Sequence, residues 1–188
     1  LLKSVSYETY RNLIDKYEAE GKSSGEEQTE ERVYYTALNQ KRYKRLDKTI
    51  EIPEEKAQFF INYPKSVCLL VITESWCADA AQIVPVVHKI AELNPKITMK
   101  LVFRDENEAL MNLFLTNGGK AIPIVVFLDL EDKVLAHWGS RPSVATKMVE
   151  EEKAKNGKLS PEFKEELQKW YNQDKGQSIL ADLTELLK

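Results

Sequence analysis

The 188-residue sequence predicts an α/β fold, in which a central mixed β-sheet is flanked by helices and extended by helices at both ends. The segment 66–72 is a short apolar run rich in β-branched residues, as expected of a strand buried on both faces. Apolar residues then recur at helical spacing over 80–90. Three more strand-like runs follow, at 98–103, 124–128 and 134–138. The last two are separated by a short turn, which indicates a hairpin.

The remaining segments supply helices. Before the first strand, 6–20 is predicted to form a helix capped by Ser6, and 30–48 a second helix after a polar loop. Between the second and third strands, 106–116 has a helical pattern that stops at Asn117, before two glycines. After the fourth strand, helices are expected from near Ser143, over 161–171 and over 178–187. We divide the chain into a helical N-terminal extension (1–59), a core (60–150) and a C-terminal helical extension (151–188), which together form one compact domain.

The candidate active site is a cysteine at the junction between the first strand and the following helix. Cys77 lies in Trp76-Cys77-Ala78-Asp79-Ala80, and we place it in the exposed first turn of the helix. Free amide groups and the positive end of the helix dipole would stabilise its thiolate there. The negative charge of Asp79 acts in the opposite sense and raises the thiol pKa.

Three segments resemble the thioredoxin family, namely 74–80, 121–123 and 133–139, and the similarity covers roughly residues 60 to 150. The Trp-Cys-x-Asp-Ala motif is similar to that of a branch of bacterial thioredoxin family proteins. The resemblance implies a thioredoxin-like fold with a cis peptide bond at Ile122–Pro123 beside Cys77. It also implies that Trp76, Ile122 and Pro123 form the substrate-binding surface.

Two departures from the thioredoxin pattern affect the expected chemistry. Ala80 stands where the family has its second, resolving cysteine, and Val71 stands where it has a buried acidic residue. Cys68 is a poor substitute, because the extended strand carries it about 16 Å from Thr73, whereas the Cα atoms of a disulfide lie within about 7 Å. The mixed disulfide on Cys77 therefore has no internal thiol to release it.

The first functional hypothesis is a monothiol thiol–disulfide oxidoreductase, in which Cys77 is the nucleophile and an external thiol is the resolver. Asp79 acts either as a proton donor or acceptor beside Cys77 or only as an anion at the helix start. The partner would be a disulfide- or sulfenate-containing protein or a low-molecular-weight thiol. The alternative is a redox-inactive module that holds a peptide between Trp76, Pro123 and the following strand. A thiol peroxidase is a third, weaker alternative.

Composition and net charge restrict the classes of partner that we expect. With a net charge of −3 and a pI near 5.6, the chain gives no reason to expect nucleic acid or an anionic membrane as partner. No apolar run reaches about 18 residues, and the first residues lack the basic region and apolar core of a signal peptide. His88 and His137 are isolated, so we expect no metal, and no cofactor is predicted. Two cysteines in unlike settings favour a reducing cytoplasm.

Overall fold

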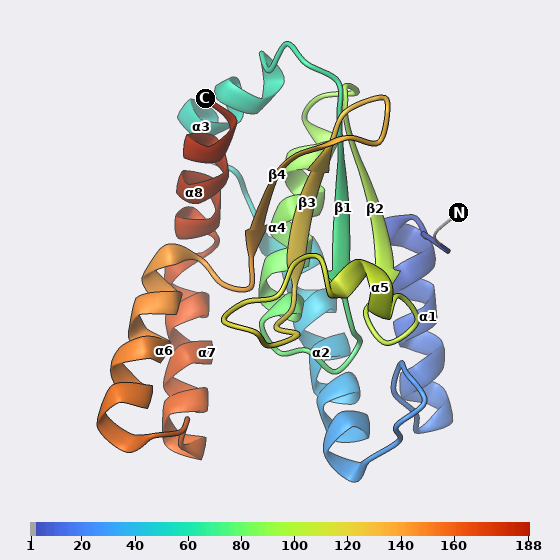
Figure 1. The fold of residues 1–188 in the computed structure, drawn as a ribbon, viewed down its shortest axis with the longest axis vertical. Helices are drawn as coiled ribbons and strands as arrows, with labels where there is room; N and C mark the ends of the chain where they lie inside the picture. Colours follow the sequence, from blue (N-terminus) through green and yellow to red (C-terminus); the bar gives the residue numbers. More distant parts are fainter. Residues whose placement is uncertain (1–2) are drawn as a thin grey trace.

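The computed structural model describes residues 3–188, and its centre is a four-stranded mixed sheet in the order β2-β1-β3-β4 (Figure 1). Its strands are β1 (Val67–Thr73), β2 (Ile97–Phe103), β3 (Ile124–Leu128) and β4 (Val134–Gly139). β1 pairs in parallel with β2 and antiparallel with β3. β3 and β4 form the predicted hairpin. The mixed sheet and the order of its elements confirm the predicted α/β fold class.

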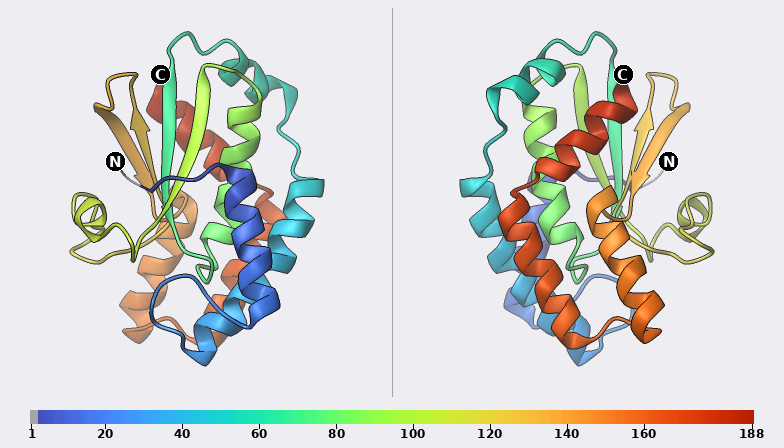
Figure 2. Two further views of the ribbon diagram at one scale, coloured as in Figure 1. Left: turned by 90° about the vertical axis from the view of Figure 1, so that its right-hand side faces the viewer. Right: turned by 90° about the vertical axis from the view of Figure 1, so that its left-hand side faces the viewer.

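The helix α4 (Ala80–Glu92) forms the crossover between the two parallel strands. Its first eight residues, Ala80–Val87, are all buried, including Pro85, whereas Glu92 at its end is exposed. Other elements must therefore cover this first part of the helix on all sides. α1 (Tyr7–Glu20) and α2 (Glu30–Thr49) lie on the same side of the sheet as α4, and short α5 (Glu108–Met111) lies on the other (Figure 2).

The N-terminal extension packs on the core through aromatic side chains. Ser6 and Thr29 cap α1 and α2 by accepting hydrogen bonds from backbone amides, as the sequence predicts for Ser6. Tyr10 and Tyr43 have no exposed surface, and their hydroxyls lie 3.2 Å apart. Val5 forms a bridge to Leu101, which covers the outer edge of β2. A further helix, α3 (Glu54–Ile61), was not predicted from the sequence.

The C-terminal part consists of α6 (Ser143–Asn156), α7 (Pro161–Asp174) and α8 (Gln177–Leu187). α6 continues past residue 150, where the sequence-based division ends the core, and stops at Gly157 in the left-handed conformation. The last helix, which the sequence predicts over 178–187, buries Leu180 and Leu183. These side chains belong to the same hydrophobic cluster as β1 and α4.

The predicted helix over 106–116 is wrong in length, because α5 has only four residues. After Met111 the chain continues in tighter turns, in which the amides of Leu113 and Phe114 bond to the carbonyls three residues earlier; Met111 and Phe114 are buried, whereas Leu113 is 73% exposed. Asn117 and Gly118 have positive φ angles, as expected of a stop signal, but they form the turn of a small bridge between Thr116 and Gly119. No helix among residues 3–188 is long and apolar enough to cross a membrane.

Candidate functional site

Cys77 lies in a loop between β1 and α4. The helix begins at Ala80, so the prediction that Cys77 belongs to its first turn is wrong by three residues. The Ala80 amide donates a hydrogen bond to the sulfur at 3.4 Å, which retains the expected interaction between the helix start and the thiol. The thiol donates to the Ile122 carbonyl oxygen at 3.3 Å, and the Ile122–Pro123 bond is cis. The loop before β3 therefore meets the thiol directly.

The thiol is buried, which corrects the expectation of an exposed cysteine. Cys77 is 7% exposed, and burial raises its pKa to about 12. The charge of Asp79 raises it further, whereas the Ala80 amide and the Arg141 guanidinium act to lower it. The thiol is therefore protonated at neutral pH, because burial raises its pKa more than the Ala80 amide at the helix start lowers it.

The Asp79 carboxylate makes two contacts with other side chains. The Arg141 guanidinium lies 2.7 Å from one carboxylate oxygen, and the Tyr171 hydroxyl donates to the other at 3.0 Å. Burial raises the pKa of Asp79, and Arg141 opposes that shift. Asp79 occupies the N-cap position of α4 without a side-chain capping bond. It therefore links the Cys77 loop to the segment after β4 and to α7.

Trp76 is held between two arginines. The guanidinium carbons of Arg32 and Arg104 lie 4.5 and 4.8 Å from the centre of its ring, a cation–π arrangement on one aromatic side chain. Both arginines also form ion pairs with Asp105, which fixes them relative to one another. The indole N–H is buried and has no hydrogen-bond acceptor among the described residues. Trp76 thus forms a rigid wall beside the thiol.

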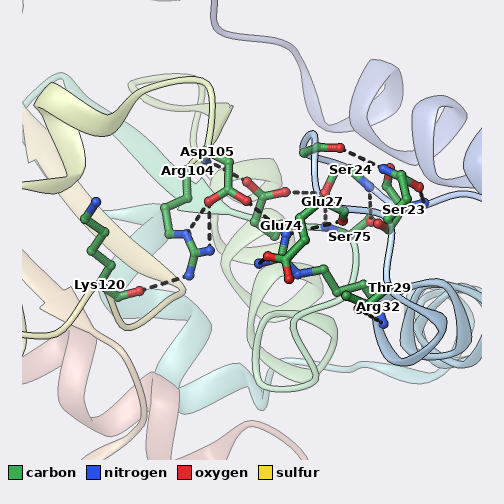
Figure 3. Close-up of polar contacts among 12 residues, drawn as sticks. Ser23, Ser24, Glu27, Thr29, Arg32, Glu74, Ser75, Arg104, Asp105 and Lys120 are labelled. Carbon is green, nitrogen blue, oxygen red and sulfur yellow. Dashed lines mark hydrogen bonds and ion pairs between the residues drawn. The ribbon is translucent and has the colours of Figure 1, made fainter.

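A buried polar cluster holds Glu74 and Ser75, the residues just before Trp76 and Cys77 (Figure 3). Glu74 accepts hydrogen bonds from the Ser24 hydroxyl and, at 2.8 Å, from the Asp105 amide. Ser24 and Ser75 exchange two further bonds at 2.8 Å, from the amide of each to the hydroxyl of the other. Burial raises the pKa of Glu74 to about 7. Thr73, Glu74 and Ser75 are residue types that can cap a helix, but Thr73 ends the strand and the other two anchor the N-terminal extension.

The site opens into a cleft of about 890 Å³. Its floor is the Trp76–Asp79 loop, and its walls come from α2, α7 and the segment before Pro123. Arg45 of α2 donates a hydrogen bond to Asn172 of α7 at 2.7 Å, so the two helices are tied together. The cations that line the cleft are Arg32, Arg42, Arg104, Lys120, Arg141 and Lys164. The sequence analysis missed their role, and the signal it contained was the run of basic residues at 41–45 in the second helix.

The two histidines make aromatic contacts. His88 stacks on Tyr7 with ring centres 3.9 Å apart, and His137 lies 5.3 Å from the ring of Phe114. Among residues 3–188, no group of three or more His, Cys, Asp or Glu side chains is placed to hold a metal ion.

Comparison with known proteins agrees with this architecture. A family model described as thioredoxin matches residues 25–155. A crystal structure of a protein of unknown function from Pseudomonas aeruginosa superposes with a TM-score of 0.62 at 16% identity, covering 97% of each chain. An HIV epitope scaffold superposes with a TM-score of 0.62 at 17% identity, covering 97% of this chain and 98% of its own. No curated protein matches the sequence. Because the family model spans well over half of its length, the chain belongs to the thioredoxin family.

Proposed function

We propose that this protein is a monothiol thiol–disulfide oxidoreductase, in which Cys77 is the nucleophile and an external thiol is the resolver. The observation that carries the proposal is the placement of the sulfur. It lies between the Ala80 amide and the Ile122 carbonyl, at the floor of a cleft large enough for a substrate. An amide N–H that points at the sulfur favours the thiolate that develops during attack.

The chemistry is an exchange of disulfide bonds in two steps. The Cys77 thiol loses its proton to solvent, and its thiolate attacks a disulfide R–S–S–R′, so that a Cys77–S–S–R bond forms and R′–S⁻ leaves. Position 80 is alanine, so no internal thiol can displace R. An external thiolate R″–S⁻ then attacks the sulfur of R, which releases the Cys77 thiolate and R–S–S–R″. Electrons balance, since one disulfide is consumed and one is formed.

Within this proposal, Asp79 is a positioning residue. Both of its carboxylate oxygens are already engaged, one by Arg141 and one by Tyr171. It holds the Arg141 guanidinium near the thiol, and that positive charge favours the thiolate. Trp76, Ile122 and Pro123 are proposed to contact the substrate around the sulfur.

A second candidate function is a redox-inactive binding module, and the burial of Cys77 with a pKa of about 12 favours it. The reaction of the reduced protein with excess hydroxyethyl disulfide separates the two candidates. The oxidoreductase is expected to gain one stable adduct on Cys77, which an added thiol removes. Cys77→Ser should abolish the adduct, and the matched variant Cys68→Ser should retain it. If the wild-type protein forms no adduct, or forms it on Cys68, the binding module is the correct function.

A further inference from the structure

Arg42 is the one half-buried cation of the cleft that has no carboxylate partner among residues 3–188. Its guanidinium donates a hydrogen bond to the Asn39 amide oxygen at 2.9 Å. The other arginines that line the cleft are all paired: Arg32 with Glu27, Arg104 with Asp105 and Arg141 with Asp79. Burying a charge without a counter-ion is costly, and an anion in the cleft would offset that cost.

The remaining charges of the cleft form no ion pair with Arg42. Asp79 acts to raise the pKa of Arg42 from beyond ion-pair distance, but both of its carboxylate oxygens are already bound, by Arg141 and Tyr171. Lys120 and Glu165 form ion pairs with residues at or beyond its rim. Lys164 and Glu31 have no ion-pair partner within the described chain. Both side chains are exposed, and their opposite charges cancel in the total charge of the cleft. In all, six cations and four carboxylates line the cleft of a chain whose net charge is −3. The cleft is therefore positive on an acidic protein, which is the pattern expected where a negatively charged ligand is bound.

The size and walls of the cleft favour a small ligand. A volume of about 890 Å³ lies within the range of pockets for small molecules, about 300–1,000 Å³. The Arg45–Asn172 hydrogen bond ties together α2 and α7, which form two of the cleft walls. Cys77 lines the same cleft and is 7% exposed, so a small molecule held in the cleft lies beside the sulfur.

We propose that the cleft takes a low-molecular-weight thiol that carries carboxylate groups, and that Arg42 binds one of these carboxylates while the thiol sulfur meets Cys77. The inference rests on the proposed function, because it names the group R of that reaction. The substrate is a mixed disulfide P–S–S–L between a protein P and the small thiol L. Cys77 takes L and releases P–S⁻, and a second L–S⁻ then forms L–S–S–L and frees the Cys77 thiolate.

The test compares three small disulfides of different charge, with adduct formation on Cys77 followed by intact mass. Oxidised glutathione carries carboxylates, hydroxyethyl disulfide is neutral, and cystamine is cationic. Each rate is divided by the rate of the same disulfide with N-acetylcysteine, which removes intrinsic reactivity. We expect the normalised rate for oxidised glutathione to exceed the other two by about tenfold or more, as one charge-assisted hydrogen bond allows. We also expect added salt to lower that rate selectively.

Variants of α2 locate the effect. Arg42→Gln should lower the glutathione rate about tenfold and leave the hydroxyethyl disulfide rate unchanged, and Arg42→Lys should restore part of the loss. Lys41→Gln is the matched control, because Lys41 is an exposed cation on the same helix and does not line the cleft. Equal normalised rates for the three disulfides, or an Arg42→Gln variant as fast as wild type with oxidised glutathione, would overturn the inference alone. No adduct with any of the three would overturn the proposed function and the inference with it.

Discussion

The pKa of Cys77 depends on two opposite charges in contact with one another. Asp79 raises the thiol pKa more than Arg141 lowers it. Asp79→Asn removes the negative charge and keeps a side-chain oxygen that can accept a hydrogen bond from Arg141. We therefore expect this variant to have a lower thiol pKa and to react with iodoacetamide severalfold faster at pH 8, since each unit of pKa corresponds to about tenfold in thiolate. Rates as a function of pH, measured in a Cys68→Ser background, test this.

Arg141→Gln is expected to shift the thiol pKa in the opposite direction, because loss of the cation raises that pKa and slows alkylation. If the two variants shift the rate in the same direction, loss of local structure rather than charge controls the thiol.

Glu74 links stability to pH. Its pKa is raised from 4.5 to about 7 by burial, so the folded state keeps a proton that the unfolded state has already lost between these values. Stability should therefore fall as pH rises from about 4.5 to about 7, by up to about 3 kcal/mol. Glu74→Gln mimics the protonated form and should be more stable than wild type at pH 8, but equal to it at pH 4.5. Denaturant titrations at the two pH values measure this, with exposed Glu31→Gln as the control.

Gly139, the last residue of β4, packs against Pro123 and Ile124 at the start of β3. It has a φ of +130°, and a Cβ atom there would lie 2.3 Å from the carbonyl oxygen of Pro123. Any side chain at this position must displace the segment that contacts Cys77. We expect Gly139→Ala to lower the free energy of unfolding by about 2 kcal/mol or more, through steric overlap added to backbone strain.

Gly118→Ala separates these two causes. Gly118 also has a positive φ, +76°, but no atom lies within 4 Å of an added Cβ. Its substitution should cost only about 1 kcal/mol, the strain alone. Equal losses for the two variants would show that contact with Pro123 is unimportant.

The elements that the sequence predicts well are those whose burial is written into a local pattern. The apolar runs of β1 and β3 and the stripe of α8 need no knowledge of their partners. α3 lacked a clear pattern because only Ala57 and Phe60 of its eight residues are buried. The start of α4 was misplaced because Glu74 and Ser75, which resemble helix caps, are instead held by Ser24 from the N-terminal extension.

In the candidate site, too, the sequence identifies only the residues that a local pattern marks. Cys77 and Pro123 were identified because short motifs mark them. Arg42, Arg141 and Tyr171 come from three separate elements and meet the site only when the chain folds. Asp79 was singled out, but its pairing with Arg141 depends on where β4 ends, which no local pattern specifies.

The terminal extensions are joined to the core by buried apolar side chains as well as by polar contacts at the Cys77 site. Leu183 in α8 is 1% exposed and belongs to the same hydrophobic cluster as β1 and α4. We therefore predict that the whole chain unfolds in one cooperative transition, with equal calorimetric and van't Hoff enthalpies. Two separate transitions would mean that the extensions are independent of the core.

Leu183→Ala tests how far the last helix stabilises the whole molecule. The truncation leaves a cavity beside α4, and we expect a loss of about 2–5 kcal/mol, which is a large part of a typical total of about 5–15 kcal/mol. The matched control is Leu186→Ala on the same helix, because Leu186 is 39% exposed and its removal should cost far less. The loss should also appear in the midpoint of a core probe, such as Trp76 fluorescence in a variant without Trp138 and Trp170. A change confined to helix content, with the Trp76 midpoint unmoved, would show that α8 can detach while the thiol site stays folded.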